Sequence, residues 1–174
     1  MTENEILGIG LLVLAYFAYK RYNKKDDSGR IKDEYVDLEN VISNIKSLKV
    51  KFSDKLKSGY TEQSVEKQLK AHLQNIYINL ISQYSIGGPK GTRIDFDLGN
   101  GKIGVEIKIA KSLFKKTEEH RLMGQIDDYK KRYSNNNLLV VVFGESEHTQ
   151  ERAHLSIIKN KIEEKSVHFL YVEM

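Results

Sequence analysis

Three residues, Asp95, Glu106 and Lys108, have the types and spacing that metal-dependent hydrolysis requires. Asp95 lies in an alternating segment from Thr92 to Leu98 (TRIDFDL), and the other two lie in a second one from Lys102 to Ile109 (KIGVEIKI). Alternation of apolar and polar residues predicts a strand in each segment, with these polar side chains on one face. Because carboxylates are hard oxygen ligands, the two acids indicate a Mg²⁺ site, beside which Lys108 would help align an attacking water.

The turn between the two segments determines how the acids face each other. Asn100-Gly101 favours a two-residue type I′ turn. In that register Asp95 lies directly across from Glu106. Cross-strand neighbours have Cβ atoms about 4.5 to 5.5 Å apart, a separation at which like charges destabilise a sheet. A bound cation would offset that repulsion; the competing interpretation is a solvated hairpin face with incidental acids.

Apolar spacing predicts the elements that position this hairpin. Residues three or four apart predict a long amphipathic helix from about Ile31 to Leu56 and, after the cap Thr61, a second helix whose stripe runs from Val65 to Tyr84. The later elements are a helix capped by Thr117 and ending near Arg132, a buried strand from Leu138 to Phe143, a helix from Thr149 to Glu164 and a strand from Val167 to Val172. We therefore expect an α/β fold with a mixed central sheet flanked by helices.

Several further residues are candidates for the same site. Glu66 borders the apolar stripe of the second helix and is expected to face the sheet, with Glu62 as its competitor. Asp97 shares the acidic strand face, as a second ligand or as a solvated acid, while Ile94, Phe96 and Leu98 are expected on the buried face. The histidines show no metal-ligand spacing. The site is therefore expected to use oxygen ligands.

These residues together resemble the PD-(D/E)XK nuclease superfamily. The pattern is Asp95, ten intervening residues and the triplet Glu106-Ile107-Lys108, in a hairpin between a glutamate-bearing helix and a later helix. The segment Gln125-Ile126-Asp127-Asp128-Tyr129 also matches the QxxxY motif of the RecB-like and lambda-exonuclease-like branches. Ile94 departs from the family's eponymous proline, and Gly91 only approximates the glycine of the RecB-like signature.

The resemblance covers roughly residues 61–174 and implies a restriction-endonuclease-like core that hydrolyses phosphodiester bonds in nucleic acid, with DNA as the expected substrate. It implies that Asp95, Glu106 and Glu66 bind Mg²⁺, with Mn²⁺ as a substitute. Lys108 would then act on the attacking water, and Gln125 would hold the substrate side of the site. The residues expected to contact nucleic acid are Tyr129, Lys111, Lys115, Lys116 and Lys130.

The composition is compatible with an enzyme that meets phosphates. The chain has 28 Lys and Arg against 24 Asp and Glu, a formal net charge of +4. The absence of cysteine excludes disulfide frameworks and thiolate metal sites. A length of 174 residues suits one catalytic domain with an additional segment.

The additional segment is N-terminal. Residues 6–19 (ILGIGLLVLAYFAY) carry no charge, acidic residues precede them, and Lys20, Arg21, Lys24 and Lys25 follow. A bilayer span needs about 20 apolar residues, which the run approaches if interfacial residues extend it to Tyr22. The positive flank predicts a single-pass membrane anchor over residues 6–22, with the N-terminus outside and the nuclease domain in the cytoplasm. The alternative is a buried or partner-binding helix.

We accordingly divide the chain into an anchor with its basic flank (1–25), a linker with the amphipathic helix (26–58) and a nuclease-like domain (59–174). The apolar stripe of the 31–56 helix resembles a short heptad seam, through which a homodimer would form. Two other classes of function stay open at this point. One is a nucleic-acid-binding protein that keeps the fold but does not cut, and the other is a membrane-anchored scaffold acting through the amphipathic helix.

Overall fold

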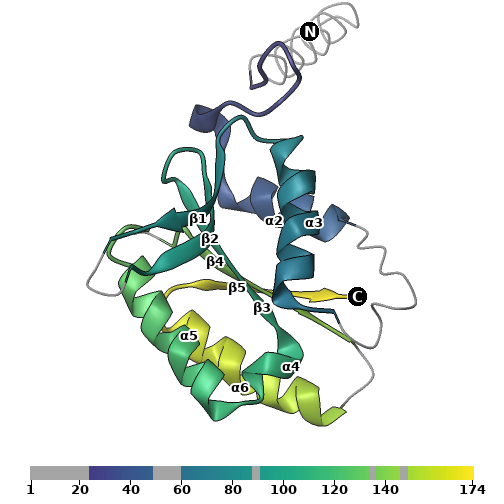
Figure 1. The fold of residues 1–174 in the computed structure, drawn as a ribbon, viewed down its shortest axis with the longest axis vertical. Coiled ribbons are helices and arrows are strands. Elements are labelled where there is room, and N and C mark those ends of the chain that lie inside the picture. Colours follow the sequence, from purple (N-terminus) through teal and green to yellow (C-terminus); the bar gives the residue numbers. More distant parts are fainter. Residues whose placement is uncertain (1–23, 49–59, 88–90, 134–135, 146–148) are drawn as a thin grey trace, which may run out of the picture.

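The computed structural model describes residues 24–48, 60–87, 91–133, 136–145 and 149–174 (Figure 1). Within them, five strands form one sheet in the order β1-β2-β3-β4-β5. The strands are β1 (Leu80–Ser85), β2 (Arg93–Leu98), β3 (Ile103–Ile109), β4 (Leu138–Gly144) and β5 (His168–Glu173). β1, β2 and β3 pair antiparallel, whereas β3, β4 and β5 pair parallel. The prediction of an α/β fold with a mixed sheet is confirmed.

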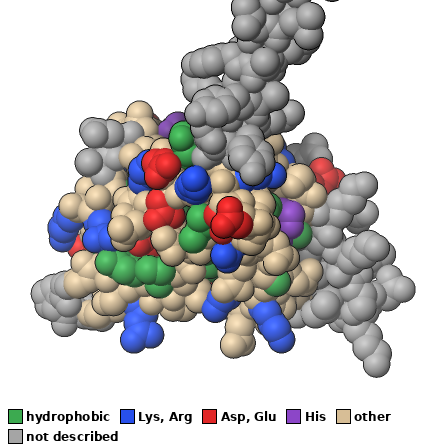
Figure 2. Space-filling model, turned by 90° about the horizontal axis from the view of Figure 1, so that it is seen from above, with side chains coloured by type: hydrophobic (Ala, Val, Ile, Leu, Met, Phe, Trp, Pro, Cys, Tyr) green, Lys and Arg blue, Asp and Glu red, His purple; other side chains and the backbone are tan. Residues whose placement is uncertain are grey.

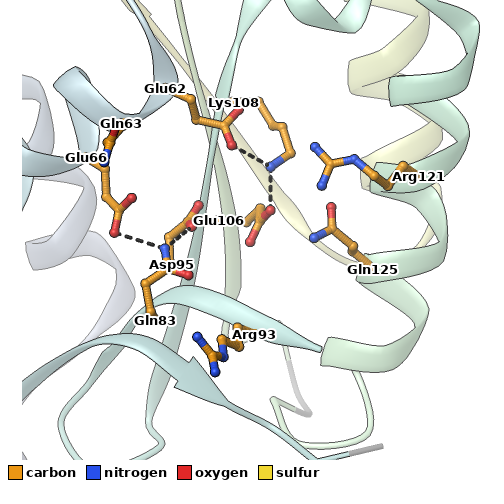
Figure 3. A pocket seen from close by; sticks show the side chains of 10 residues that line it. All are labelled: Glu62, Gln63, Glu66, Gln83, Arg93, Asp95, Glu106, Lys108, Arg121 and Gln125. Carbon is orange, nitrogen blue, oxygen red and sulfur yellow. Dashed lines mark hydrogen bonds and ion pairs between the residues drawn. The ribbon is translucent and has the colours of Figure 1, made fainter. Parts of the chain in front are cut away.

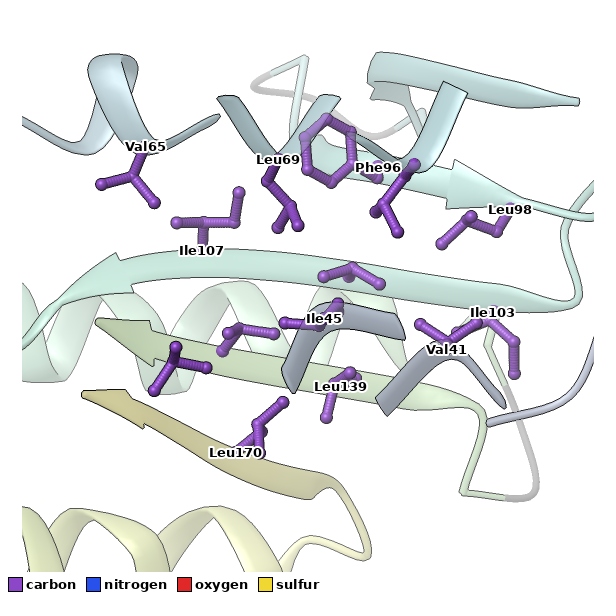
Figure 4. Close-up of a cluster of buried hydrophobic side chains, with 14 of the residues drawn as sticks. Val41, Ile45, Val65, Leu69, Phe96, Leu98, Ile103, Ile107, Leu139 and Leu170 are labelled. Atoms are coloured by element: carbon purple, nitrogen blue, oxygen red, sulfur yellow. The ribbon is translucent and has the colours of Figure 1, made fainter. Parts of the chain in front are cut away.

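Helices cover both faces of this sheet (Figure 1). The helices before β1 are the short 3₁₀ helix η1 (Asp33–Tyr35), α2 (Leu38–Ser47) and α3 (Glu62–Gln74), and those after β3 are α4 (Ala110–Leu113), α5 (Lys116–Tyr129) and α6 (Thr149–Glu164). α2 and α3 pack on one face through a buried apolar cluster that includes Val41, Leu69 and Ile107 (Figure 4). A second cluster packs α4, α5 and α6 on the opposite face.

β4 belongs to both apolar clusters, as its continuous apolar sequence predicts. Leu139, Val141 and Phe143 pack toward α2 and α3, whereas Val140 and Val142 pack toward α5 and α6. All seven residues of the strand are buried. β4 therefore holds β3, the middle strand of the sheet, and with it the position of Glu106 and Lys108.

The hairpin between β2 and β3 has the register that the turn sequence predicts from Phe96 to Leu98, but the pairing ends there, so the expected Asp95–Glu106 pair is not part of the ladder. Leu98 pairs with Ile103, and Phe96 pairs with Val105. Asn100 and Gly101 have φ values of 57° and 89°, the positive values that a type I′ turn requires at both central positions. The local turn chemistry therefore sets which residues of β3 lie beside which residues of β2.

The strict alternation expected for β2 is wrong at Ile94. Ile94 packs in the cluster of α5 and α6, whereas Phe96 and Leu98 pack in the cluster of α2 and α3. The β1–β2 register passes from Ser82↔Phe96 to Tyr84↔Ile94 and leaves out Gln83 and Asp95. Gln83 has a φ of 52°, which is uncommon for a residue other than glycine. This local irregularity turns Ile94 to the other face and places Asp95 at the break.

Two predicted helices have other bounds in the structure. The helix expected from Ile31 begins only at Leu38, because Asp37 caps it by accepting from the Asn40 backbone amide, while Ile31 bridges to Tyr77. Residues 49–59 lie outside the described ranges. The second helix ends at Gln74, and its expected continuation through Tyr84 is wrong because Leu80–Ser85 form the edge strand β1.

The helix expected from Thr117 is α5, which begins at Lys116 and ends at Tyr129. Its N-cap is Lys115, whose side chain makes no capping hydrogen bond, so the expected Thr117 cap is wrong. α6 has the predicted bounds, and β4 and β5 match their predicted segments to within a residue at each end. The QxxxY segment therefore forms the last turns of α5.

The predicted membrane anchor at residues 6–22 lies outside the described ranges and stays a prediction, as does its orientation. Among the described helices, none has both the length and the apolar character needed to span a bilayer. Within the predicted dimer seam, Val41 and Ile45 are fully buried in the chain's own core. These two positions therefore stabilise the domain itself.

Candidate active site

The five residues predicted to be catalytic line one pocket, with a volume of about 350 Å³ (Figure 3). They are Glu66 on α3, Asp95 on β2, Glu106 and Lys108 on β3, and Gln125 on α5. The pocket is further lined by Glu62, Gln63, Gln83, Arg93 and Arg121. Residues 59 positions apart in the chain thus meet where two helices flank the strands of the hairpin.

Asp95 occupies the break in the sheet and bonds to both neighbouring strands. Its Oδ2 accepts from the backbone amide of Ile107 at 2.7 Å, and its Oδ1 accepts from Gln83 Nε2 at 2.9 Å. The Asp95 side chain thus replaces some of the backbone hydrogen bonds that β2 lacks at this position. Burial, and then the negative charge of Glu106, raise the pKa of Asp95 to about 7. A cation beside Asp95 would therefore stabilise the ionised form of this carboxyl group.

Glu106 and Lys108 form a buried ion pair on β3, with Lys108 Nζ 2.5 Å from Glu106 Oε1 and each side chain 2% exposed. Burial raises the pKa of Glu106, although Lys108 opposes the shift. Burial alone would lower the pKa of Lys108, but the charges of Glu106, Glu62 and Asp95 outweigh it and raise that pKa. Lys108 is therefore an ammonium ion inside the acidic cluster.

Both glutamates of α3 reach the site, so the choice between Glu62 and Glu66 is not exclusive. Glu66 Oε1 accepts from Gln83 Nε2 at 2.9 Å, the same nitrogen that contacts Asp95. Glu62 Oε1 lies 3.4 Å from Lys108 Nζ. Gln83 was not predicted as a site residue, because Leu80 and Tyr84 on either side of it continue the helical spacing of the preceding helix. The one available signal was a polar residue in the apolar segment Leu80–Ser85, ten residues before the Asp95 strand begins.

The QxxxY residues lie against Glu106. Tyr129 is fully buried, and its hydroxyl lies 2.8 Å from Glu106 Oε2 and 2.7 Å from the carbonyl oxygen of Arg93. Gln125 Nε2 donates to the same hydroxyl at 3.1 Å. The expected contact of Tyr129 with nucleic acid is wrong, because a buried ring cannot reach a ligand. Tyr129 instead fixes the position of the Glu106 carboxylate.

The lysines expected to contact nucleic acid lie outside this pocket. Lys111, Lys115, Lys116 and Lys130 are exposed, and Lys130 Nζ donates to the carbonyl oxygen of Lys165. On the face drawn in Figure 2, Lys and Arg side chains are interspersed with Asp and Glu side chains. Contact of these four lysines with nucleic acid stays a prediction.

Asp97 does not belong to the site. It is 1% exposed, its Oδ1 accepts from the Gly101 backbone amide at 2.9 Å, and its Oδ2 lies 3.7 Å from Arg132 Nη2. Asp97 is absent from the pocket lining, so neither the ligand role nor the solvated role expected for it is correct. Its carboxylate instead stabilises the hairpin turn.

The donor set fits a hard divalent cation in its chemistry. Glu66 and Asp95 present oxygens to one shared nitrogen of Gln83, and Glu106 presents an oxygen to the Lys108 ammonium. Positive or hydrogen-bearing groups thus occupy the points where the carboxylates converge. Within the described ranges, no three His, Asp or Glu side chains stand close enough together to hold a metal ion as arranged. Metal binding would require Glu106 or Glu66 to exchange its present partner.

Comparison with protein-family models, with curated proteins and with solved structures finds no match to this chain. The candidate function therefore depends on the residues of the pocket and on their geometry.

Proposed function

We propose that this chain is a metal-dependent nuclease with a restriction-endonuclease-like core of the PD-(D/E)XK type, acting on nucleic acid and first of all on DNA. The observation that supports the proposal is the meeting of Asp95, Glu106 and Lys108 with Glu66 and Gln125 in one pocket. Spacing and a motif selected these residues, and four separate elements contribute them. An accidental set of surface acids would not be expected to converge in this way.

Asp95, Glu106 and Glu66 are the residues that would hold the metal, because their oxygens suit Mg²⁺ or Mn²⁺. When bound, such an ion supplies Lewis acidity and makes water a better nucleophile. In the hydrolysis, the water oxygen bonds to phosphorus and the ester bond to the leaving oxygen breaks. The products are a phosphate monoester and an alcohol. The water gives up one proton and the leaving oxygen gains one.

The chain's own groups would act on the charge that develops in this reaction. Lys108 carries a positive charge that its carboxylate neighbours maintain, so it can stabilise additional negative charge on a phosphoryl oxygen. Gln125 Oε1 is buried and has no hydrogen-bond partner among the described residues, so it can accept from a water or a substrate hydroxyl. Tyr129 keeps Glu106 in place during these steps.

The test is cleavage by the purified full chain on linear duplex, circular duplex and single-stranded DNA and on RNA, with Mg²⁺ or Mn²⁺ and with EDTA. We expect metal-dependent cleavage that Glu106→Gln and Asp95→Asn abolish. Lys108→Met is expected to keep most substrate binding and lose most of the rate, since its role lies in the transition state. Binding without cleavage of any of these substrates would contradict the proposal.

That last outcome would favour a second candidate, a nucleic-acid-binding protein of the same fold that does not cut. The observation in its favour is the closed Glu106–Lys108 ion pair, which satisfies Glu106 without a metal. The two candidates differ in whether Mn²⁺ raises the melting temperature of the full chain, because only a metal-binding site stabilises the folded state by mass action.

A further inference from the structure

Three cationic side chains line the pocket, and two of them already have partners. Lys108 has three N–H donors, and its Nζ contacts three acceptors, namely Glu106 Oε1, Glu62 Oε1 and the carbonyl oxygen of Ile107. Arg121 donates from Nε and Nη2 to Glu118 Oε2 at 2.8 and 2.6 Å. Lys108 has no donor left for an anion unless it releases an acceptor, whereas Arg121 keeps its Nη1 donors but has its charge partly neutralised by Glu118.

Arg93 is the third cation, and its guanidinium has no hydrogen bond or ion pair with any residue that the structure describes. Its backbone, in contrast, is held on two sides. The carbonyl oxygen accepts from the buried Tyr129 hydroxyl at 2.7 Å, and Arg93 pairs with Ser85 in the sheet. An exposed cation with free donors thus extends from a fixed point at the pocket (Figure 3).

The charge of the pocket makes this cation relevant to an anionic substrate. Four carboxylates, those of Glu62, Glu66, Asp95 and Glu106, line the same space and would repel a phosphodiester. A guanidinium presents N–H groups in a planar fork that matches two phosphate oxygens. Arg93 precedes Asp95 by two residues on β2, roughly 7 Å along a strand. A phosphate bound by Arg93 would therefore be the phosphodiester that lies beside Asp95 or its neighbour along the nucleic-acid strand.

We propose that Arg93 binds a backbone phosphate of the nucleic acid and positions the strand over the acidic cluster. This inference rests on the proposed function for its substrate, but its test measures binding and not cleavage. Because Tyr129 contacts both the Arg93 carbonyl oxygen and Glu106, one side chain fixes the phosphate-binding residue relative to a site carboxylate. Arg93 is thus a substrate-positioning residue that the sequence pattern alone does not distinguish from a solvated strand arginine.

The experiment measures the affinity of the full chain for a fluorescein-labelled duplex and a labelled single strand in EDTA, over a series of salt concentrations. Arg93→Gln is expected to weaken binding about tenfold and to reduce the slope of log K against log salt by about 0.9 for duplex or 0.7 for single strand, as the loss of one phosphate contact requires. Arg93→Lys is expected to keep the slope and lose part of the affinity, because it keeps the charge without the fork.

The matched control is Lys159→Gln, which removes one exposed positive charge on α6, outside the pocket. It is expected to keep the wild-type affinity and slope. The melting temperature of Arg93→Gln should equal that of the wild type, since its guanidinium has no partner to lose. If Arg93→Gln does not fold, the decision falls to Arg93→Lys, for which unchanged affinity overturns the proposal.

The outcomes separate this inference from the proposed function. Wild-type affinity and slope in folded Arg93→Gln would overturn the role of Arg93, even in a chain that cleaves DNA. An Arg93-dependent slope in a chain that cleaves nothing would leave the phosphate contact standing and remove the nuclease activity. Absence of any nucleic-acid binding by the wild-type chain would overturn the inference directly.

Discussion

The hydroxyl of Tyr129 lies 2.8 Å from Glu106 Oε2, which links the end of α5 to the central strand of the site. Glu106 is 2% exposed, and its other oxygen contacts Lys108. Both oxygens of this carboxylate are thus held by buried groups. Burial, and then the charge of Glu106, raise the pKa of Tyr129 and keep the hydroxyl protonated as a donor. The tyrosine of the QxxxY motif therefore holds the Glu106 carboxylate in place from inside the core.

Tyr129→Phe should test this support. The substitution removes one hydrogen bond to a buried carboxylate, so we expect unfolding in urea to show a loss of about 1 to 3 kcal/mol. Nuclease activity should fall further than stability explains, because Glu106 gains freedom to move. The control is Tyr77→Phe, which removes the hydrogen bond from Asn44 Nδ2 to the hydroxyl of a buried tyrosine that does not line the pocket. Equal losses of activity in the two variants would contradict a specific role for Tyr129.

Glu106→Gln should destabilise the metal-free chain. From the sequence alone, removal of one acid from a facing pair would be expected to stabilise it. The structure reverses that expectation, because Glu106 is the main partner of a buried ammonium. Breaking a buried ion pair on one side costs about 3 to 5 kcal/mol. Urea unfolding of Glu106→Gln in EDTA measures the loss, and the double variant with Lys108→Met should recover much of it. A more stable Glu106→Gln would show that repulsion from Asp95 dominates.

The hairpin and its acids were predictable because local rules determine them. Alternation gave both strands, and the turn formed by Asn100 and Gly101 gave a register that matches the observed pairing of Phe96 with Val105. The fully apolar sequence of β4 likewise indicated burial on both faces. These features depend on residues close together in the chain, where period and turn chemistry act directly.

The features that sequence reasoning missed depend on pairing between distant segments. Leu80 and Tyr84 continue the helical spacing of α3, yet they pair with β2 in an edge strand, because tertiary pairing overrides local period. The turn of Ile94 to the other face accompanies the break in pairing at Gln83 and Asp95, which no local pattern predicts. The contact of Gln83 with Glu66 and Asp95 could not be predicted while β1 itself was unrecognised.

Gln83→Glu should make the stability of the chain depend more strongly on divalent cations. The Gln83 amide nitrogen donates to Glu66 and Asp95 at 2.9 Å each, so a carboxylate in its place would add a third negative charge where hydrogen bonds were. We expect a lower melting temperature in EDTA and a larger rise with Mn²⁺ than the wild type shows. Gln74→Glu, at the exposed end of α3, serves as the charge control. An equal Mn²⁺ response in Gln83→Glu and wild type would exclude a cation at this point.

The metal-free chain should lose stability as pH rises from about 4 to about 7, in part through Asp95. Burial, and then the charge of Glu106, raise the pKa of Asp95 from 3.8 to about 7 in the folded state. Well below pH 4 the Asp95 carboxyl is protonated in both the folded and the unfolded state, so the stability of the folded chain is not reduced by its ionisation. Between these values the unfolded chain releases the proton and the folded chain keeps it, so ionisation favours unfolding.

Each pKa unit corresponds to about 1.4 kcal/mol, so the contribution of Asp95 is expected to reach a few kcal/mol. Other groups of the cluster titrate too, and burial raises the pKa of Glu106 in the same direction. Asp95→Asn isolates one group, because an amide cannot ionise and still accepts from the Ile107 backbone amide. Urea unfolding in EDTA at several pH values should therefore give a flatter profile for Asp95→Asn than for the wild type. Parallel profiles would mean that Asp95 is already ionised in the folded chain and that Gln83 and Lys108 neutralise it without a bound proton.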